Sequence, residues 1–164
     1  MRLSLLLPLL AAAALAACGE ADRPDDVVDP ARGEGVPRIV PAEEALASVH
    51  VPTLDPASMT RAEIDKALGS PTLCVFRYTS TGRPVLATAF EAAGAPVRGV
   101  VKLGGDLVLL DAASGESGAR VRLEAGDIRI VVSPLEGEDR RAEMTFAVGE
   151  ELHAGYGGFH DCWE

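Results

Sequence analysis

From Thr72 to the C-terminus the sequence alternates between apolar and polar residues, and this period of two constrains the fold most strongly. Val121 and Leu123, for example, are separated and flanked by charged residues. Such alternation is typical of strands with one buried face, and Gly, Pro, Asp and Ser between the runs indicate turns. The pattern predicts seven to eight strands: Thr72–Tyr78, Pro84–Phe90, Val97–Leu103, Leu107–Leu110, Ala119–Glu124, Ile128–Val132, Arg141–Val148 and a short one around Tyr156–Cys162.

The connections between these strands are short. None is long enough for the crossover that parallel strands need. We therefore expect a mainly β (α+β) fold in which an antiparallel meander forms a curved sheet or a small barrel.

One or two short helices are expected before the strands. The segment 41–50 places Pro41 at a first helical position and acids in the first turn. In the segment 59–71, Thr60 and Glu63 have the spacing of a capping box, and Gly69 can adopt the left-handed conformation that ends a helix.

The N-terminus carries a second pattern. Arg2 precedes an apolar run from Leu3 to Ala17, which is too short to be a permanent membrane-spanning helix and predicts a secretory signal over residues 1–17. The stretch from Leu15 to Cys18 resembles the lipobox of bacterial lipoprotein precursors. That resemblance implies cleavage before Cys18 and a lipid on its thiol. The alternative is an ordinary signal peptide with a chance cysteine.

The lipobox resemblance also carries an expectation about location. In the enteric version of lipoprotein sorting, an aspartate directly after the lipidated cysteine retains the protein at the inner membrane. Gly19 occupies that position here. We therefore expect a lipid-anchored protein of the bacterial envelope that lies on the outer membrane and faces the periplasm. Residues 18–40 are acidic and rich in Pro and Gly, which predicts a disordered tether after the lipidated cysteine; an ordered arm packed on the domain is the alternative. Residues 41–164 are expected to form a single β-rich domain.

The cysteine count adds a covalent expectation. The chain has three cysteines, and an odd thiol in an exported protein needs an explanation. If Cys18 carries lipid, Cys74 and Cys162 remain as a pair that an oxidising compartment would join, stapling the first strand to the last. Two free thiols or metal ligation are the alternatives.

Net charge limits the partners. The formal charge is −10, and removal of the leader with Arg2 would make it −11. An acidic protein repels nucleic acid and anionic headgroups, so we expect no nucleic-acid partner. A basic envelope protein would be attracted, and salt would weaken the encounter.

No motif indicates catalysis. The segment 115–118 contains Ser117, but the glycine spacing of an esterase elbow is absent. His153, His160 and Asp161 are the strongest metal-ligand candidates, yet their spacing matches no compact zinc pattern. We expect no enzyme activity, no metal and no cofactor. The alternative is a hydrolase whose pocket unites His153 or His160 with a carboxylate and a nucleophile.

The C-terminal aromatic residues are candidates for contact. Tyr156, Phe159 and Trp163 lie close together in the sequence among glycines, and Tyr78 could join them across the disulfide. Aromatic clusters of this kind form contact surfaces or close the core of a small β-domain.

Two segments of the mature chain resemble known families. The first resembles the outer-membrane assembly lipoproteins of the SmpA/OmlA type at Met59, Thr60, Glu63, Ile64, Leu68, Gly69 and Pro71. This resemblance implies an accessory role in outer-membrane assembly. The chain departs from that family in continuing well beyond a few strands.

The strand region resembles the membrane-bound C-type lysozyme inhibitors, which are small lipid-anchored barrels with a disulfide. Cys74 and the segment 117–120 carry this resemblance, which implies a contact loop containing Ser117, Gly118 and Arg120. Val121 replaces the expected aromatic residue, and the segment 130–134 lacks the lysine-glycine pair of those inhibitors. Together these patterns predict a lipid-anchored envelope protein with a non-catalytic binding or accessory role.

Overall fold

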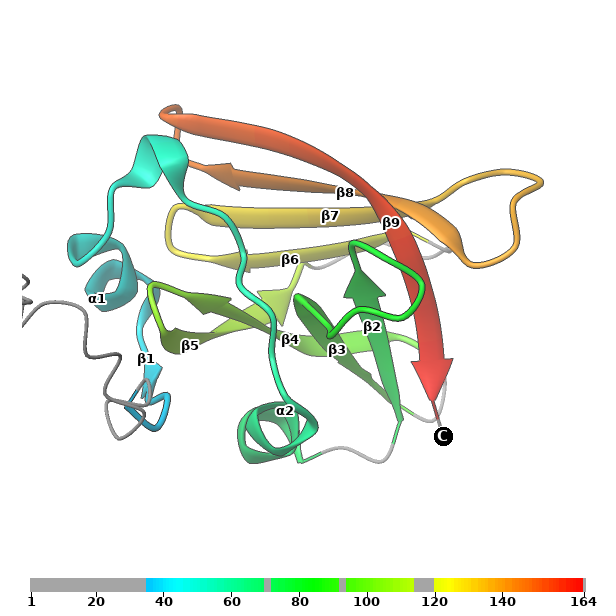
Figure 1. Cartoon of the computed structure of the whole chain (residues 1–164), viewed down its shortest axis with the longest axis horizontal. Helices are drawn as coiled ribbons and strands as arrows, with labels where there is room; N and C mark the ends of the chain where they lie inside the picture. Colours follow the sequence, from blue (N-terminus) through cyan, green and yellow to red (C-terminus); the bar gives the residue numbers. More distant parts are fainter. Residues whose placement is uncertain (1–34, 70–71, 92–93, 114–119, 164) are drawn as a thin grey trace, which may run out of the picture. The chain divides into compact units, whose positions relative to one another are not determined.

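The computed structural model of the protein describes residues 35–69, 72–91, 94–113 and 120–163. Along the chain (Figure 1) the elements are β1 (Ile39–Val40), α1 (Ala42–Ala47), η1 (Val51–Thr53), α2 (Arg61–Leu68), β2 (Leu73–Arg77), β3 (Leu86–Phe90), β4 (Pro96–Leu103), β5 (Asp106–Ala112), β6 (Val121–Ala125), β7 (Ile128–Pro134), β8 (Arg141–Val148) and β9 (Leu152–Trp163).

The strands β2 to β9 form a closed antiparallel barrel of eight strands. Each strand pairs with its neighbours in the chain, and β9 returns to pair with β2. Between β5 and β6 the pairing is confined to Asp111↔Glu124 and Ala112↔Leu123. The prediction of an antiparallel meander closed into a small barrel is confirmed.

Large side chains fill the barrel interior. The alternation in β8 turns Ala142, Met144, Phe146 and Val148 inward, and none of them is more than 5% exposed. Phe76 of β2 is fully buried in the same cluster. The interior is therefore a packed core, as the dimensions of an eight-stranded barrel allow.

Helix α2 lies against the outside of the barrel (Figure 1). Ile64 and the preceding Met59 are fully buried there against apolar side chains of β2 to β5. The predicted capping box forms, because the Thr60 side chain accepts from the Glu63 amide and the Glu63 carboxylate accepts from the Thr60 amide. Gly69 ends the helix at φ 56°, as predicted.

A largely buried ion pair fixes α2 to β4. Lys102 Nζ lies 3.1 Å from Glu63 Oε1, and both side chains are less than 15% exposed. Burial by itself would raise the pKa of Glu63, but hydrogen bonds from the Thr60 amide and from Lys102 lower it below its usual value.

The predicted tether over residues 18–40 ends earlier than expected. Residues 18–34 lie outside the described residues, whereas Ile39 and Val40 pair in parallel with Leu107 and Val108 of β5. Val40 is 6% exposed and belongs to the barrel core. The acidic composition of the segment predicts a tether. Its last two residues, Ile39 and Val40, are β-branched and pair with β5 at the point where β5 and β6 diverge.

Two element lengths also differ from expectation. The helix predicted over 41–50 is the six-residue α1, with Pro41 as its N-cap. The last strand is much longer than predicted, since β9 spans 12 residues. Its first half contains Gly155, which has low strand propensity and weakened the pattern.

The predicted disulfide joins the strands that close the barrel. Cys74 of β2 and Cys162 of β9 are bonded and stand directly opposite each other. On the outer face beside them, Asp161 accepts hydrogen bonds from Arg77 and Arg140. The Arg140 hydrogen bond and the two guanidinium charges lower the pKa of Asp161, although its burial acts in the opposite direction.

Candidate functional site

The predicted contact loop is only partly visible. Ser117 and Gly118 lie outside the described residues. Arg120 is exposed, and its Nε donates a hydrogen bond to Ser133 Oγ at 3.1 Å.

The aromatic residues of β9 do not form one surface. Tyr156 packs toward the barrel core, whereas Phe159 lies on the outer face, where the Arg141 guanidinium stacks 4.9 Å from its ring centroid. Trp163 pairs with Leu73 at the far end of the strand. Tyr156 and Phe159 therefore do not belong to one cluster, because a strand turns residues an odd number of positions apart to opposite faces, and the Trp163 side chain lies outside what the structure describes.

Tyr156 instead helps to close one end of the barrel. Its ring lies 5.2 Å from that of Tyr78, and its hydroxyl donates to Asp55. The Tyr78 hydroxyl donates to the Pro56 carbonyl at 3.1 Å. Burial, and secondarily the Asp55 charge, raises the pKa of Tyr78 to about 12. Burial and the hydrogen bond to Asp55 also raise the pKa of Tyr156, so both tyrosines stay neutral and serve as donors.

The two histidines of β9 do not converge. His153 is exposed, and His160, seven residues later, faces the opposite side of the strand. Burial lowers the pKa of His160, with a smaller opposing effect from Asp161. Within the described ranges, no group of three His, Cys, Asp or Glu residues could hold a metal ion. No helix in those ranges is long and apolar enough to cross a membrane.

A shallow groove lies on the outer face of β8 and β9. A Cβ atom added to Gly155 or Gly157 would meet no atom within 4 Å. The missing side chains leave a cavity of about 310 Å³, lined by Glu143, Met144, Thr145, Gly155, Tyr156 and Gly157. Glycine in a strand is typical of places where another backbone approaches closely.

The groove adjoins a strand edge without a partner strand. The His160 amide donates to the Arg140 carbonyl at 2.8 Å, so even-numbered residues of β9 face β8, and by alternation odd-numbered residues face away. Strand β2 pairs with Phe159 to Trp163 and ends at Arg77. We call His153, Gly155 and Gly157 the open edge, since no described residue forms a backbone hydrogen bond on that side of them.

Acidic side chains surround the open edge. Glu143 lies opposite Gly157 in the register, and Glu150 and Glu151 stand in the turn before β9; all three are exposed. Asp55 adds a fourth carboxylate through its bond to Tyr156. Three arginines lie next to this acidic group: Arg77 and Arg141 stand opposite Phe159, two residues beyond Gly157, and Arg140 bonds to His160. Each of them is paired with a carboxylate, Asp161 or Glu138.

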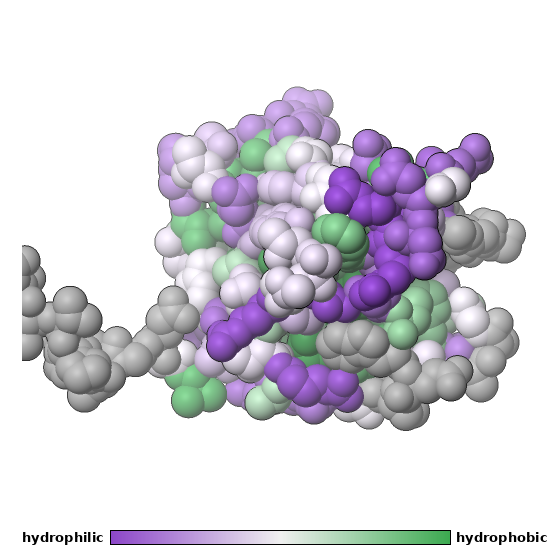
Figure 2. All heavy atoms as spheres, turned by 45° about the vertical axis from the view of Figure 1, so that its right-hand side comes forward, coloured by the Kyte–Doolittle hydropathy of each residue, from purple (hydrophilic) through white to green (hydrophobic). Residues whose placement is uncertain are grey.

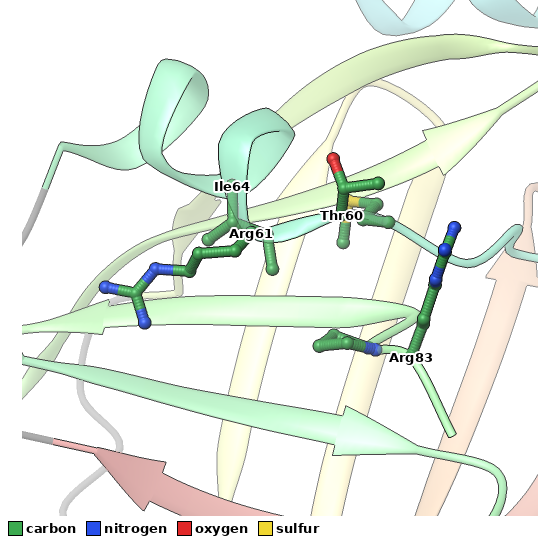
Figure 3. Close-up of a pocket in the computed structure, with 6 residues that line it drawn as sticks. Thr60, Arg61, Ile64 and Arg83 are labelled. Atoms are coloured by element: carbon green, nitrogen blue, oxygen red, sulfur yellow. The ribbon is translucent and has the colours of Figure 1, made fainter. Parts of the chain in front are cut away.

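A second pocket lies between α2 and the start of β3. It also measures about 310 Å³ and is lined by Met59, Thr60, Arg61, Ile64, Arg83 and Pro84. Figure 3 shows Arg61 and Arg83 on opposite sides of this pocket, with Thr60 and Ile64 between them. We call it the arginine pocket.

The face of the molecule shown in Figure 2 is largely hydrophilic, and its apolar residues form small separate patches. Recognition on such a surface depends on backbone groups, charge and pockets rather than on one large apolar area. The sequence carried a signal for the groove that was missed: in 155–157, glycines at alternate positions leave one face of a strand bare.

The comparisons with known proteins give a family. Residues 14–164 match the model of the family described as Domain of unknown function (DUF6692), and the chain belongs to that family. No curated protein and no solved structure matches the chain.

Proposed function

We propose that this member of the DUF6692 family is a lipid-anchored protein of the bacterial envelope with a non-catalytic binding role. Cys18 carries the lipid, the protein faces the periplasm from the outer membrane, and the open edge of β9 accepts an extended segment of a basic envelope protein. The observation that supports the binding role most strongly is that, within ranges 35–69, 72–91, 94–113 and 120–163, no backbone group pairs with the outward side of Gly155 and Gly157.

Strand addition fits this edge physically. An extended peptide beside β9 would satisfy the outward-facing N–H and C=O groups of Gly155 and Gly157, which gives affinity without a large apolar surface. The bare groove next to the edge leaves room for side chains of the added strand.

The charges around the edge favour a basic partner. Glu143, Glu150 and Glu151 have no ion-pair partner among the described residues. A lysine or arginine in the added strand would therefore meet carboxylates that no cation in the described part of the chain neutralises. Charge of this kind accelerates encounter and weakens with salt.

One sequence feature supports the lipid anchor: the stretch from Leu15 to Cys18 resembles the lipobox. We expect Cys18→Ala to move the protein from the membrane fraction to the soluble or unprocessed fraction and to abolish incorporation of a labelled fatty acid. Retention of the label on the Cys18→Ala protein would contradict the anchor.

We expect Gly157→Val to abolish binding at the open edge without weakening the fold. Nothing lies within 4 Å of the added Cβ, and valine favours strands more than glycine does, so the thermal midpoint should be unchanged or higher. The measurement is titration of the full lipidated protein in detergent with an eight-residue peptide of alternating lysine and valine. The affinity should fall by at least about tenfold, since the valine side chain fills the groove that side chains of the added strand would occupy.

Charge variants provide the matched control. Glu143→Gln removes a carboxylate from the groove and should lower the affinity for the peptide severalfold at low salt. Glu136→Gln removes an exposed carboxylate from the β7–β8 loop and should leave the affinity unchanged. A peptide of alternating glutamate and valine should not bind. Equal binding by wild type and Gly157→Val would contradict strand addition at this edge.

The lysozyme-inhibitor resemblance gives a second candidate function. The barrel and its disulfide agree with what that resemblance implies about fold, and Arg120 is exposed. A lytic assay with and without the protein distinguishes the two. Inhibition that Arg120→Ala removes and Gly157→Val does not would favour the inhibitor.

A further inference from the structure

We propose that the arginine pocket binds a small amphipathic anion: a single carboxylate or phosphate group attached to a short hydrocarbon chain. The site is separate from the open edge, because the two share no lining residue. It would give the protein a small-molecule ligand besides its protein partner.

The apolar part of the pocket surface comes from Pro84, which is partly exposed, and from the aliphatic parts of the Arg61 and Arg83 side chains. Met59 and Ile64 lie beneath this surface and are fully buried against the barrel, so they support it. A hydrocarbon chain of a ligand would cover this exposed apolar area, which is favourable in proportion to the area removed from water.

The walls of the pocket are held in place by the fold. The Met59 amide donates to the Pro84 carbonyl at 2.7 Å, which joins the two sides. Thr60 is fixed by its reciprocal hydrogen bonds with Glu63. A pocket that already has its bound shape loses less conformational entropy when a ligand enters.

The charge at the mouth is positive, which selects an anion. Arg83 is exposed, and no carboxylate of the described residues lies within ion-pair distance of it. Arg61 lies 2.8 Å from Asp65. The Glu63 carboxylate is engaged by Lys102 and by the Thr60 amide. Arg83 therefore supplies the main contact to the anionic head, and Arg61 adds a weaker attraction because Asp65 partly neutralises it.

The test is calorimetric titration of the full lipidated protein with octanoate, acetate and octylamine. Octanoate should bind, and acetate should bind at least about tenfold more weakly, since each buried methylene group raises the affinity about fourfold. Octylamine, which has the same chain and the opposite charge, should not bind. Equal affinity for octanoate and acetate, or for octanoate and octylamine, would overturn the proposal.

Arginine variants locate the binding. Arg83→Gln should lower the affinity for octanoate by about tenfold or more, and Arg61→Gln should lower it by less. Arg129→Gln removes an exposed arginine from β7, outside the pocket, and should change nothing. If Arg83→Gln and Arg129→Gln bind octanoate equally, the assignment is wrong. Peptide binding at the open edge should be normal in Arg83→Gln, so the two proposals can fail separately.

Cosedimentation with lipid vesicles identifies whether the ligand is a membrane lipid or a soluble molecule. Vesicles containing phosphatidylglycerol present the same combination of anion and hydrocarbon as a membrane surface. Cosedimentation that depends on Arg83, measured with the unlipidated Cys18→Ser chain, would assign the pocket to lipid. Octanoate binding without cosedimentation would assign it to a soluble amphiphile. Arg83-independent cosedimentation without octanoate binding would overturn the proposal.

Discussion

Replacing both Cys74 and Cys162 with alanine is expected to lower the free energy of unfolding by about 4 kcal/mol. The disulfide links positions 88 residues apart, and a loop of this size greatly restricts the unfolded chain in the chain-entropy account. The measurement is equilibrium denaturation in urea of the wild type and the double variant, under oxidising conditions.

Reduction supplies the control for this prediction. In a strong reductant, the wild-type transition should shift to that of the double variant, which itself should not respond. If the wild type unfolded at the same urea concentration with and without reductant, the prediction would be wrong. Strands β2 and β9 would then be held together by their backbone hydrogen bonds and the Arg77–Asp161 contact alone.

Phe76→Ala is expected to destabilise the protein by about 3–5 kcal/mol. Phe76 is fully buried inside the barrel, and its ring lies edge-on to Tyr78 at 6.3 Å. Two Phe76 ring carbons also lie within 3 Å of where a Cβ on Gly158 would stand. The neighbours of such a ring cannot move far into the space that it leaves, so most of the removed side-chain volume remains as a cavity.

Val97→Ala is the matched control, because Val97 lies on β4 but is 45% exposed. Its effect should be within about 0.5 kcal/mol. The comparison separates a packed barrel from one that encloses a ligand. A loss below about 1 kcal/mol for Phe76→Ala would indicate a hollow interior, which would place a binding site inside the barrel rather than on its outer surface.

Much of the barrel could be predicted because its residues follow local rules. The alternation in Arg141–Val148 gave the bounds of β8 and its four buried residues, although Ala147 is buried as well. The capping box at Thr60 formed as its spacing indicates. The pairing of Cys74 with Cys162 followed from cysteine parity and from strand order, neither of which needs long-range geometry.

The features that escaped prediction depend on contacts between distant segments. Two residues, Ile39 and Val40, form a strand only because β5 offers a free edge to them. The arginine pocket unites Arg61 and Arg83 from different elements, and no periodicity links those positions. The open edge exists because β2 ends at Arg77 while β9 continues past it, and the length of a partner strand is invisible in the sequence of β9 itself.

Amide hydrogen exchange along β9 tests the central claim most directly, since that claim is an unpaired strand edge that takes up a peptide. In the free protein, the amides of Ala154, Tyr156 and Gly158, which face β8, should be protected, whereas those of Gly155 and Gly157 should exchange as if exposed. A saturating amount of the lysine–valine peptide should then protect Gly155 and Gly157. Uniform protection along β9 before the peptide is added, or no change at these two glycines afterwards, would contradict the account.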